Sequence, residues 1–255
     1  MRLSGWILAG GALLLAGCGH HAQTASAPPP PPVSGPAARP QGSTTPTSPR
    51  TEQGSQQESQ QESELGAHPA PTGRPIYTEV GMASWYGPPY NKRRGANGEI
   101  YDQNAITAAH RTLPMGSLIR VTNLQSGQSA MMRVTDRGPF VPNRVIDLSV
   151  GAAKAVGVWR AGTARVRIEV FEAPKPINAG GRWCVQIGAF ANEGTAKKLE
   201  ERLTNEYGSA NVIEFTGPTG HWVRIRPENG DKRQAIAIVR SMRLTEGAAY
   251  LVRMD

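Results

Sequence analysis

Between residues 79 and 171 the chain alternates short apolar segments with turns that are rich in glycine and proline. Residues 79–86 set the pattern, because they alternate β-branched and aromatic side chains with smaller ones and end before Pro88 and Pro89. The predicted strands are 79–86, 118–123, 130–135, 145–148 and 165–171. Ser149 is a suitable N-cap for one short helix over 152–156. Short strands with such turns and a single short helix predict a small closed β-barrel.

A second unit follows, and its elements have a different order. The predicted elements are a strand at 183–190, a helix at 193–207, strands at 212–216 and 221–226, a helix at 231–243 and a strand at 248–253. The first helix is indicated by Ala196, Leu199 and Leu203, which share one helical face. The order βαββαβ is the split βαβ pattern, which gives an α+β domain.

The formal net charge of +8 suggests an anionic partner, for which nucleic acid and membrane surfaces are the common choices. A generally basic, soluble surface explains the same charge equally well. RNA-binding domains use the βαββαβ order, but their basic-aromatic signature is absent from these strands. We therefore expect no nucleic-acid partner. The chain has two cysteines, too few for a disulfide scaffold.

The N-terminus has the pattern of an export signal. Arg2 precedes an apolar run at 6–16 that is too short to span a bilayer as a mature helix. The sequence Leu-Ala-Gly-Cys that ends at Cys18 has the form of a bacterial lipobox, so we predict a lipoprotein signal peptide at 1–17 and lipidation of Cys18. Acyl chains anchor a protein because each buried CH₂ contributes about 0.8 kcal/mol. Gly19, in place of Asp, resembles the sorting signal for the outer membrane of Gram-negative bacteria.

Residues 18–76 contain little that a folded core would bury. The segment includes a run of prolines at 28–32 and a Gln/Glu/Ser tract at 53–64, so it is predicted to be a disordered tether. As a flexible coil it would extend about 40 Å root-mean-square. His20, His21 and His68 are in this part of the chain without other ligands nearby, and the sequence predicts neither a metal nor a cofactor.

Five motifs run in order through the predicted barrel. They are GMASWYG at 81–87, ANGEIYD at 96–102, TAAH at 107–110, DRGPF at 136–140 and RVIDLS at 144–149. In order and spacing the series resembles the rare lipoprotein A family. The resemblance implies a six-stranded double-psi β-barrel at 77–173 and an outer-membrane lipoprotein that faces the periplasm. It also implies a lytic transglycosylase that acts on septal peptidoglycan.

The resemblance defines the chemistry that the site must perform. Ordinary glycosidases use two carboxyl groups, one as acid and one as base or nucleophile. A lytic transglycosylase can use one acid/base group: it protonates the leaving oxygen, and the C6 hydroxyl of the same muramic acid attacks C1. The product is a 1,6-anhydro ring, and no water enters. Two alternatives stay open, namely a hydrolase that leaves a reducing end and an expansin-like protein that binds the wall without cutting it.

Four residues fall on the motif positions that the resemblance assigns to the active groove. Asp136 is the first candidate for the acid, because it begins the loop at 136–140. Glu99 and His110 are expected to orient the sugar or complete a proton relay, and Asp102 to support its loop. Each also has a plain structural alternative: a turn-initiating Asp136, a solvated Glu99 and a satisfied, partly buried His110.

Other residues are candidates for sugar contacts. Trp85 and Tyr86 are expected either to stack on sugar rings or to pack in the core. Arg137 and Arg144 are expected either to meet substrate carboxylates or to be surface charges. Asp147 precedes the short helix, and we expect it to be structural.

The second unit resembles a SPOR domain. VQIGAF at 185–190 and WVRIRP at 222–227 carry this resemblance, which implies binding of glycan strands stripped of stem peptides at the division site. We expect the domain at 182–255, after a linker at 174–181. Its candidate glycan-binding residues are Gln186, Phe190, Trp222 and Arg224. Because alternate strand residues face the helices, about half of these four are candidates for the core.

Overall fold

The computed structural model describes residues 73–255 except 209, 210, 218 and 246. The predicted signal peptide at 1–17, the lipidation site Cys18 and the tether as far as residue 72 lie outside the described residues. In the part of the chain that the structure describes, no helix is long and apolar enough to cross a membrane.

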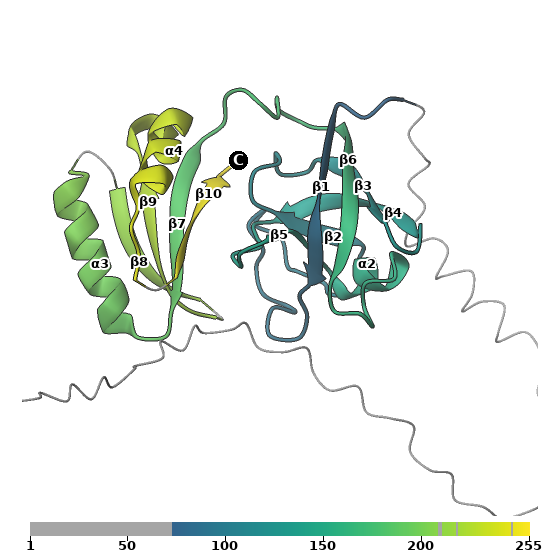
Figure 1. Cartoon of the computed structure of the whole chain (residues 1–255), viewed down its shortest axis with the longest axis horizontal. Coiled ribbons are helices and arrows are strands. Elements are labelled where there is room, and N and C mark those ends of the chain that lie inside the picture. Colours follow the sequence, from purple (N-terminus) through teal and green to yellow (C-terminus); the bar gives the residue numbers. More distant parts are fainter. Residues whose placement is uncertain (1–72, 209–210, 218, 246) are drawn as a thin grey trace, which may run out of the picture.

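The first unit is a closed barrel of six strands (Figure 1). They are β1 (Tyr77–Trp85), β2 (Thr107–His110), β3 (Leu118–Asn123), β4 (Ser129–Asp136), β5 (Arg144–Leu148) and β6 (Ala164–Glu172). Around the barrel the order is β1-β5-β2-β4-β3-β6, and the pairs β1–β5 and β2–β4 are parallel. The five predicted strands are confirmed. The strand pattern did not predict β2, because four residues with two alanines carry little β-propensity of their own.

Inward-facing side chains fill the barrel, as alternation in its strands predicts. The fully buried set includes Ile119, Val121, Met132, Val134, Ile146, Leu148, Val166, Ile168 and Val170. The helix α2 (Val150–Ala155) packs Ala152 and Ala153 against this core. It begins as predicted, since Ser149 Oγ accepts a hydrogen bond from the Ala152 N–H at 3.0 Å.

The second unit is a four-stranded antiparallel sheet of order β10-β7-β9-β8. Its elements are β7 (Trp183–Phe190), α3 (Glu193–Glu206), β8 (Asn211–Gly217), β9 (Gly220–Arg226), η1 (Glu228–Gly230), α4 (Lys232–Ser241) and β10 (Ala248–Arg253). The predicted βαββαβ order is confirmed. Figure 1 shows both helices on the side of the sheet that is turned away from the barrel. The opposite side, the helix-free face, is directed at the barrel.

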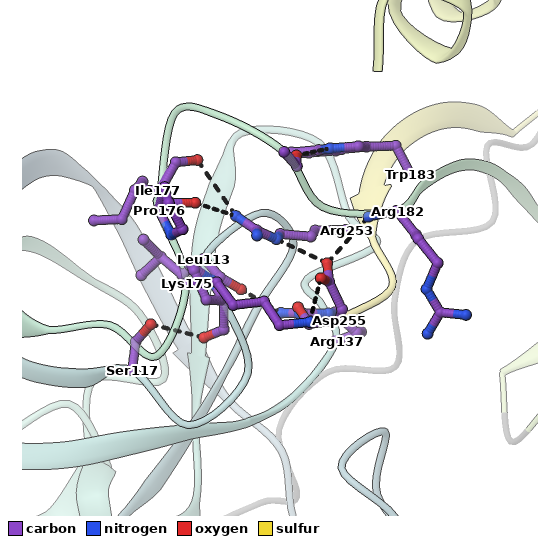
Figure 2. A network of polar contacts seen from close by, with 12 residues as sticks. Leu113, Ser117, Arg137, Lys175, Pro176, Ile177, Arg182, Trp183, Arg253 and Asp255 are labelled. Atoms are coloured by element: carbon purple, nitrogen blue, oxygen red, sulfur yellow. Dashed lines mark hydrogen bonds and ion pairs between the residues drawn. The ribbon is translucent and has the colours of Figure 1, made fainter. Parts of the chain in front are cut away.

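Polar contacts join the two units (Figure 2). Asp255 accepts hydrogen bonds from Lys175 Nζ at 2.7 Å and from Arg253 Nε at 3.0 Å through its carboxylate. Its backbone oxygen accepts one from Arg137 Nη2 at 2.8 Å. Arg253, which is fully buried, also donates through Nη1 to the Pro176 carbonyl at 2.7 Å. These bonds hold the connecting segment, the end of β10 and the loop after β4 together.

Candidate active site

A pocket of about 130 Å³ opens where β4 ends, beside the loop between β1 and β2. It is lined by Gly95, Asn97, Glu99, Ile100, Tyr101, Asp102, Ala105, Thr107, Thr135 and Asp136. Three of the four predicted catalytic residues, Glu99, Asp102 and Asp136, are therefore brought together. They are separated by up to 37 positions in the sequence and meet because β2 pairs with the end of β4.

Asp136 is the most enclosed carboxyl group of the pocket lining. One oxygen, Oδ1, accepts hydrogen bonds from the Ala96 N–H at 3.0 Å and from the Arg137 N–H at 2.8 Å. Burial raises the pKa of Asp136 above its ordinary value, although these hydrogen bonds and the Arg137 charge act in the opposite direction. The hydrogen bonds fix the orientation of the carboxyl group, while Oδ2 has no assigned donor among the described contacts. Such a group can deliver a proton from a defined position.

Glu99 and Asp102 lie on the loop opposite Asp136. Glu99 is exposed, and its Oε2 accepts a hydrogen bond from Asn97 Nδ2 at 2.7 Å. Asn97 Oδ1 in turn accepts from the Glu99 N–H at 3.0 Å, so the turn holds its own acidic side chain. Asp102 Oδ1 accepts a hydrogen bond from the Asn104 N–H at 2.9 Å, which stabilises the part of the loop that leads to β2.

His110 is placed apart from the pocket lining, with 3% of its surface exposed. Its Nδ1 accepts hydrogen bonds from the N–H groups of Thr112 (3.2 Å) and Leu113 (3.0 Å). The proton is therefore on Nε2, which is 3.1 Å from Glu79 Oε2 and donates to it. Burial lowers the pKa of His110 while Glu79 opposes this shift, so the ring is a neutral donor that shapes the turn after β2.

Glu79 is the partner of His110, and the sequence motifs did not indicate it. It lies on β1, 31 residues before His110, and although burial raises its pKa, the hydrogen bonds from His110 and Tyr77 leave the pKa below its ordinary value. The Tyr77 hydroxyl also donates to it at 3.2 Å, and burial raises the pKa of Tyr77 to about 12. Glu79 on β1 contacts His110 on β2, and β5 lies between these two strands in the barrel. No local sequence pattern encodes this contact.

The two aromatic candidates at the end of β1, Trp85 and the following Tyr86, pack against other aromatic side chains. Trp85 lies against Trp159, with ring centroids 4.2 Å apart. Tyr86 stacks on Tyr101 at 4.5 Å and is 9% exposed. Since Tyr101 lines the pocket, Tyr86 supports the pocket wall from behind, and burial raises its pKa above the ordinary range.

Both arginine candidates of the barrel are engaged within the protein. Arg137 Nη1 donates to the carbonyl oxygens of His110 and Leu113 at 2.9 and 2.7 Å, and burial lowers its pKa to about 10. Arg144 Nη2 donates to Asp147 Oδ2 at 3.1 Å. Burial raises the pKa of Asp147 to about 6, although Arg144 and Arg111 lower it. The expectation that Asp147 is structural agrees with this ion pair.

In the second unit, three of the four candidates share the helix-free face. Arg224 Nη2 donates to Gln186 Oε1 at 2.7 Å across the β7–β9 pair, and Trp222 lies on the same face with 5% exposed. Phe190 is instead 2% exposed and packs in the core under the helices. The register shifts between Ile187 and Phe190, and this irregularity turns Phe190 to the opposite side.

No group of three His, Cys, Asp or Glu side chains that could hold a metal ion occurs within the described residues. Cys184, on β7, is a free and fully buried thiol.

Comparison with known proteins places both units. Residues 78–168 match a family model described as lytic transglycolase, and residues 179–253 match the SPOR domain. The chain is 42% identical over 167 residues to a protein of Campylobacter jejuni, which covers 56% of this chain and 61% of that protein. It is 56% identical over 161 residues to one of Pseudomonas aeruginosa, which covers 62% of this chain and 47% of that protein.

Both relatives are named endolytic peptidoglycan transglycosylase RlpA. A relative from Neisseria meningitidis with the same name is 53% identical over 136 residues, 52% of this chain and 57% of that protein. The chain thus spans between 47% and 61% of the length of these curated relatives. Residues 78–168 thus carry a lytic transglycolase domain and residues 179–253 a SPOR domain, and the chain is similar over part of its length to proteins named RlpA.

Proposed function

We propose that the protein is a lytic transglycosylase that cleaves the bond between N-acetylmuramic acid and N-acetylglucosamine in peptidoglycan. The observation that carries the proposal is the pocket in which Asp136, a carboxyl group with a raised pKa, faces Glu99 and Asp102. The name of the matched family model and the names of the relatives support the same reaction. The enzyme would be a lyase that needs no cofactor.

In the proposed reaction Asp136 donates its proton to the bridging oxygen as the bond to C1 breaks. The C6 hydroxyl of the same muramic acid attacks C1, and its proton passes to the Asp136 carboxylate. The acid is regenerated and a 1,6-anhydro end is formed. The two backbone N–H groups at Oδ1 stabilise the carboxylate that exists between these two proton transfers.

The remaining candidates take supporting roles in the proposal. Glu99 is exposed at the rim of the pocket and orients the sugar. Asp102 stabilises the loop that leads from Glu99 to β2. His110 acts as a positioning residue, because its backbone oxygen holds Arg137, which directly follows the acid. Tyr86 supports the wall of the pocket through Tyr101, whereas Trp85 packs with Trp159 against the barrel core.

The domain and location assignments belong to the same proposal. Residues 77–173 form the catalytic domain, 174–181 the linker and 182–255 the SPOR domain that binds peptide-free septal glycan. Residues 1–17 are the signal peptide, and Cys18 carries the lipid that holds the protein in the outer membrane. The tether at 18–76 lets the domains reach the glycan from there.

Product analysis tests the reaction. The full chain is incubated with peptide-free glycan strands, and the products are identified by mass spectrometry. We expect 1,6-anhydromuramic ends. Reducing ends in their place would indicate a hydrolase, and intact strands that remain bound to the protein would indicate an expansin-like binder.

A further inference from the structure

The barrel covers the face of the second unit that lacks helices. Cys184, Tyr250 and Val252 form a buried cluster on this face, and Phe140 of the barrel packs against it. The Phe140 ring lies edge-on to Trp222 and to Tyr250, with centroids 5.3 and 5.8 Å away. Phe140 thus contacts the aromatic side chains of β9 and β10 together.

Phe140 reaches the sheet from the loop that begins at Asp136. The same loop is tied to the second unit by the bond from Arg137 to the Asp255 backbone oxygen, which Figure 2 shows. A further bond runs from the Arg253 N–H to the Arg111 carbonyl at 2.9 Å, and the Arg111 guanidinium lies 5.6 Å from the Tyr250 ring centroid. The loop of the candidate acid and the helix-free face therefore form one contact.

Besides these bonds, some buried polar atoms near the contact have no hydrogen-bond partner among the described residues. They include the Nε atoms of Arg137 on the barrel loop and of Arg224 on the sheet. A buried donor without an acceptor is unfavourable, and this cost offsets part of the free energy that the apolar side chains contribute to the contact. Phe140 is only partly buried and stands outside the barrel core. A contact of this kind can open without unfolding either domain.

We propose that the helix-free face has two mutually exclusive occupants, the Phe140 loop of the barrel and a peptide-free glycan strand. This rests on the proposed function, in which the SPOR domain binds peptide-free glycan, with Gln186, Trp222 and Arg224 as its candidate contacts. A sugar ring on Trp222 would take the place of the Phe140 ring, and sugar oxygens would accept from the Arg224 donor. Glycan capture therefore detaches the second unit from the barrel and frees the loop that follows Asp136.

The native thiol of Cys184 reports this opening, since it is fully buried on the covered face. In a Cys18→Ser background of the full chain it is the only cysteine. Phe140→Ser removes the ring from the contact, and Phe140→Leu keeps part of the apolar contact. Phe171→Ser is the matched control, because that ring packs against Arg120 on the barrel, where it contacts neither Trp222 nor Tyr250.

Two quantities are measured for each variant. One is the rate at which N-ethylmaleimide alkylates Cys184, and the other is the affinity for peptide-free glycan strands. For Phe140→Ser we expect both to increase at least about tenfold, because apparent affinity scales with the fraction of molecules in the competent state. Phe140→Leu should lie between it and the parent, and Phe171→Ser should match the parent. Circular dichroism verifies that each variant is folded.

The outcomes separate this inference from the proposed function. Unchanged alkylation in Phe140→Ser overturns the docked state. Faster alkylation with unchanged glycan affinity overturns the competition while the glycan-binding role stands. Faster alkylation with no glycan binding by any protein, the parent included, overturns both the competition and the proposed role of the sheet.

Discussion

At the scale of single residues, the environment of Asp136 separates it from the other carboxyl groups of the pocket. It is enclosed and receives two backbone hydrogen bonds, whereas Glu99 is exposed and bonded to its own turn. A raised pKa increases the protonated fraction near neutral pH, which an acid requires. Glu99 is the second candidate because it lines the same pocket.

Asp136→Asn is expected to reduce cleavage of peptide-free glycan at least about a hundredfold, because an amide of the same size cannot donate the catalytic proton. Anhydro ends are counted by mass spectrometry, and thermal unfolding verifies the fold. Glu172→Gln, a matched change of an exposed carboxylate on β6, should retain activity. Full activity in folded Asp136→Asn would transfer the acid role to Glu99.

Asp147 has a predicted effect on stability as a function of pH. Its pKa in the folded state is about 6, above the ordinary value, so the folded state binds the proton more tightly than the unfolded chain does. Stability therefore decreases as pH rises from about 4 to about 6, by at most about 3 kcal/mol from this group. Asp147→Asn should show a smaller decrease over that range in denaturant titrations. If the stability of Asp147→Asn depends on pH in the same way as that of the parent, Asp147 is not the group responsible for the decrease.

At the scale of elements, Ser149 connects three parts of the barrel. Its Oγ accepts from the Ala152 N–H at the start of α2 and from the Thr107 N–H of β2 at 3.3 Å, and it donates to the Ala105 carbonyl. This explains why a four-residue strand is held in place and why the pocket wall at residues 105–107 is fixed.

Ser149→Ala is expected to lower the free energy of unfolding by about 1–2 kcal/mol, the usual cost of an N-cap, with the buried donors adding to it. Urea unfolding measures the change. Ser126→Ala, in the exposed turn between β3 and β4, is the control and should stay within about 0.5 kcal/mol of the parent. If both variants lose the same free energy of unfolding, the Ser149 contacts do not stabilise the barrel more than an exposed serine does.

At the scale of the whole molecule, the two units differ in how they are joined and how they are anchored. The connecting segment is held by Lys175, Arg253 and Asp255, so the docked arrangement has its own polar support (Figure 2). Anchoring is proposed for the other end of the chain, where a lipid on Cys18 would hold the protein while the tether allows it to search the glycan.

Cys18→Ser is expected to move the protein from the membrane fraction to the soluble fraction when cells are lysed and fractionated after a salt wash. The physical reason is the loss of the acyl chains, each CH₂ of which contributes about 0.8 kcal/mol. Cys184→Ser changes the other cysteine and should leave the protein in the membrane fraction. Retention of both variants would argue against a lipid anchor at Cys18.

Local sequence information was sufficient for most elements. Alternation predicted five barrel strands and the βαββαβ order, and Ser149 predicted the start of α2, because these features depend on neighbours within a few residues. The motif series indicated the barrel and brought Glu99, Asp102 and Asp136 into one hypothesis before their proximity was known. The tether predicted from composition stays a prediction, because residues up to 72 lie outside the described part of the chain.

The tertiary structure decided which side chains face each other. It paired His110 with Glu79, turned Phe190 into the core through a register shift, and placed Phe140 against Trp222 and Tyr250. It also formed β2 from a segment of low propensity by pairing it on both sides. These contacts join residues about 30 to 110 positions apart. They follow from strand register and barrel closure, which a period-two pattern does not encode.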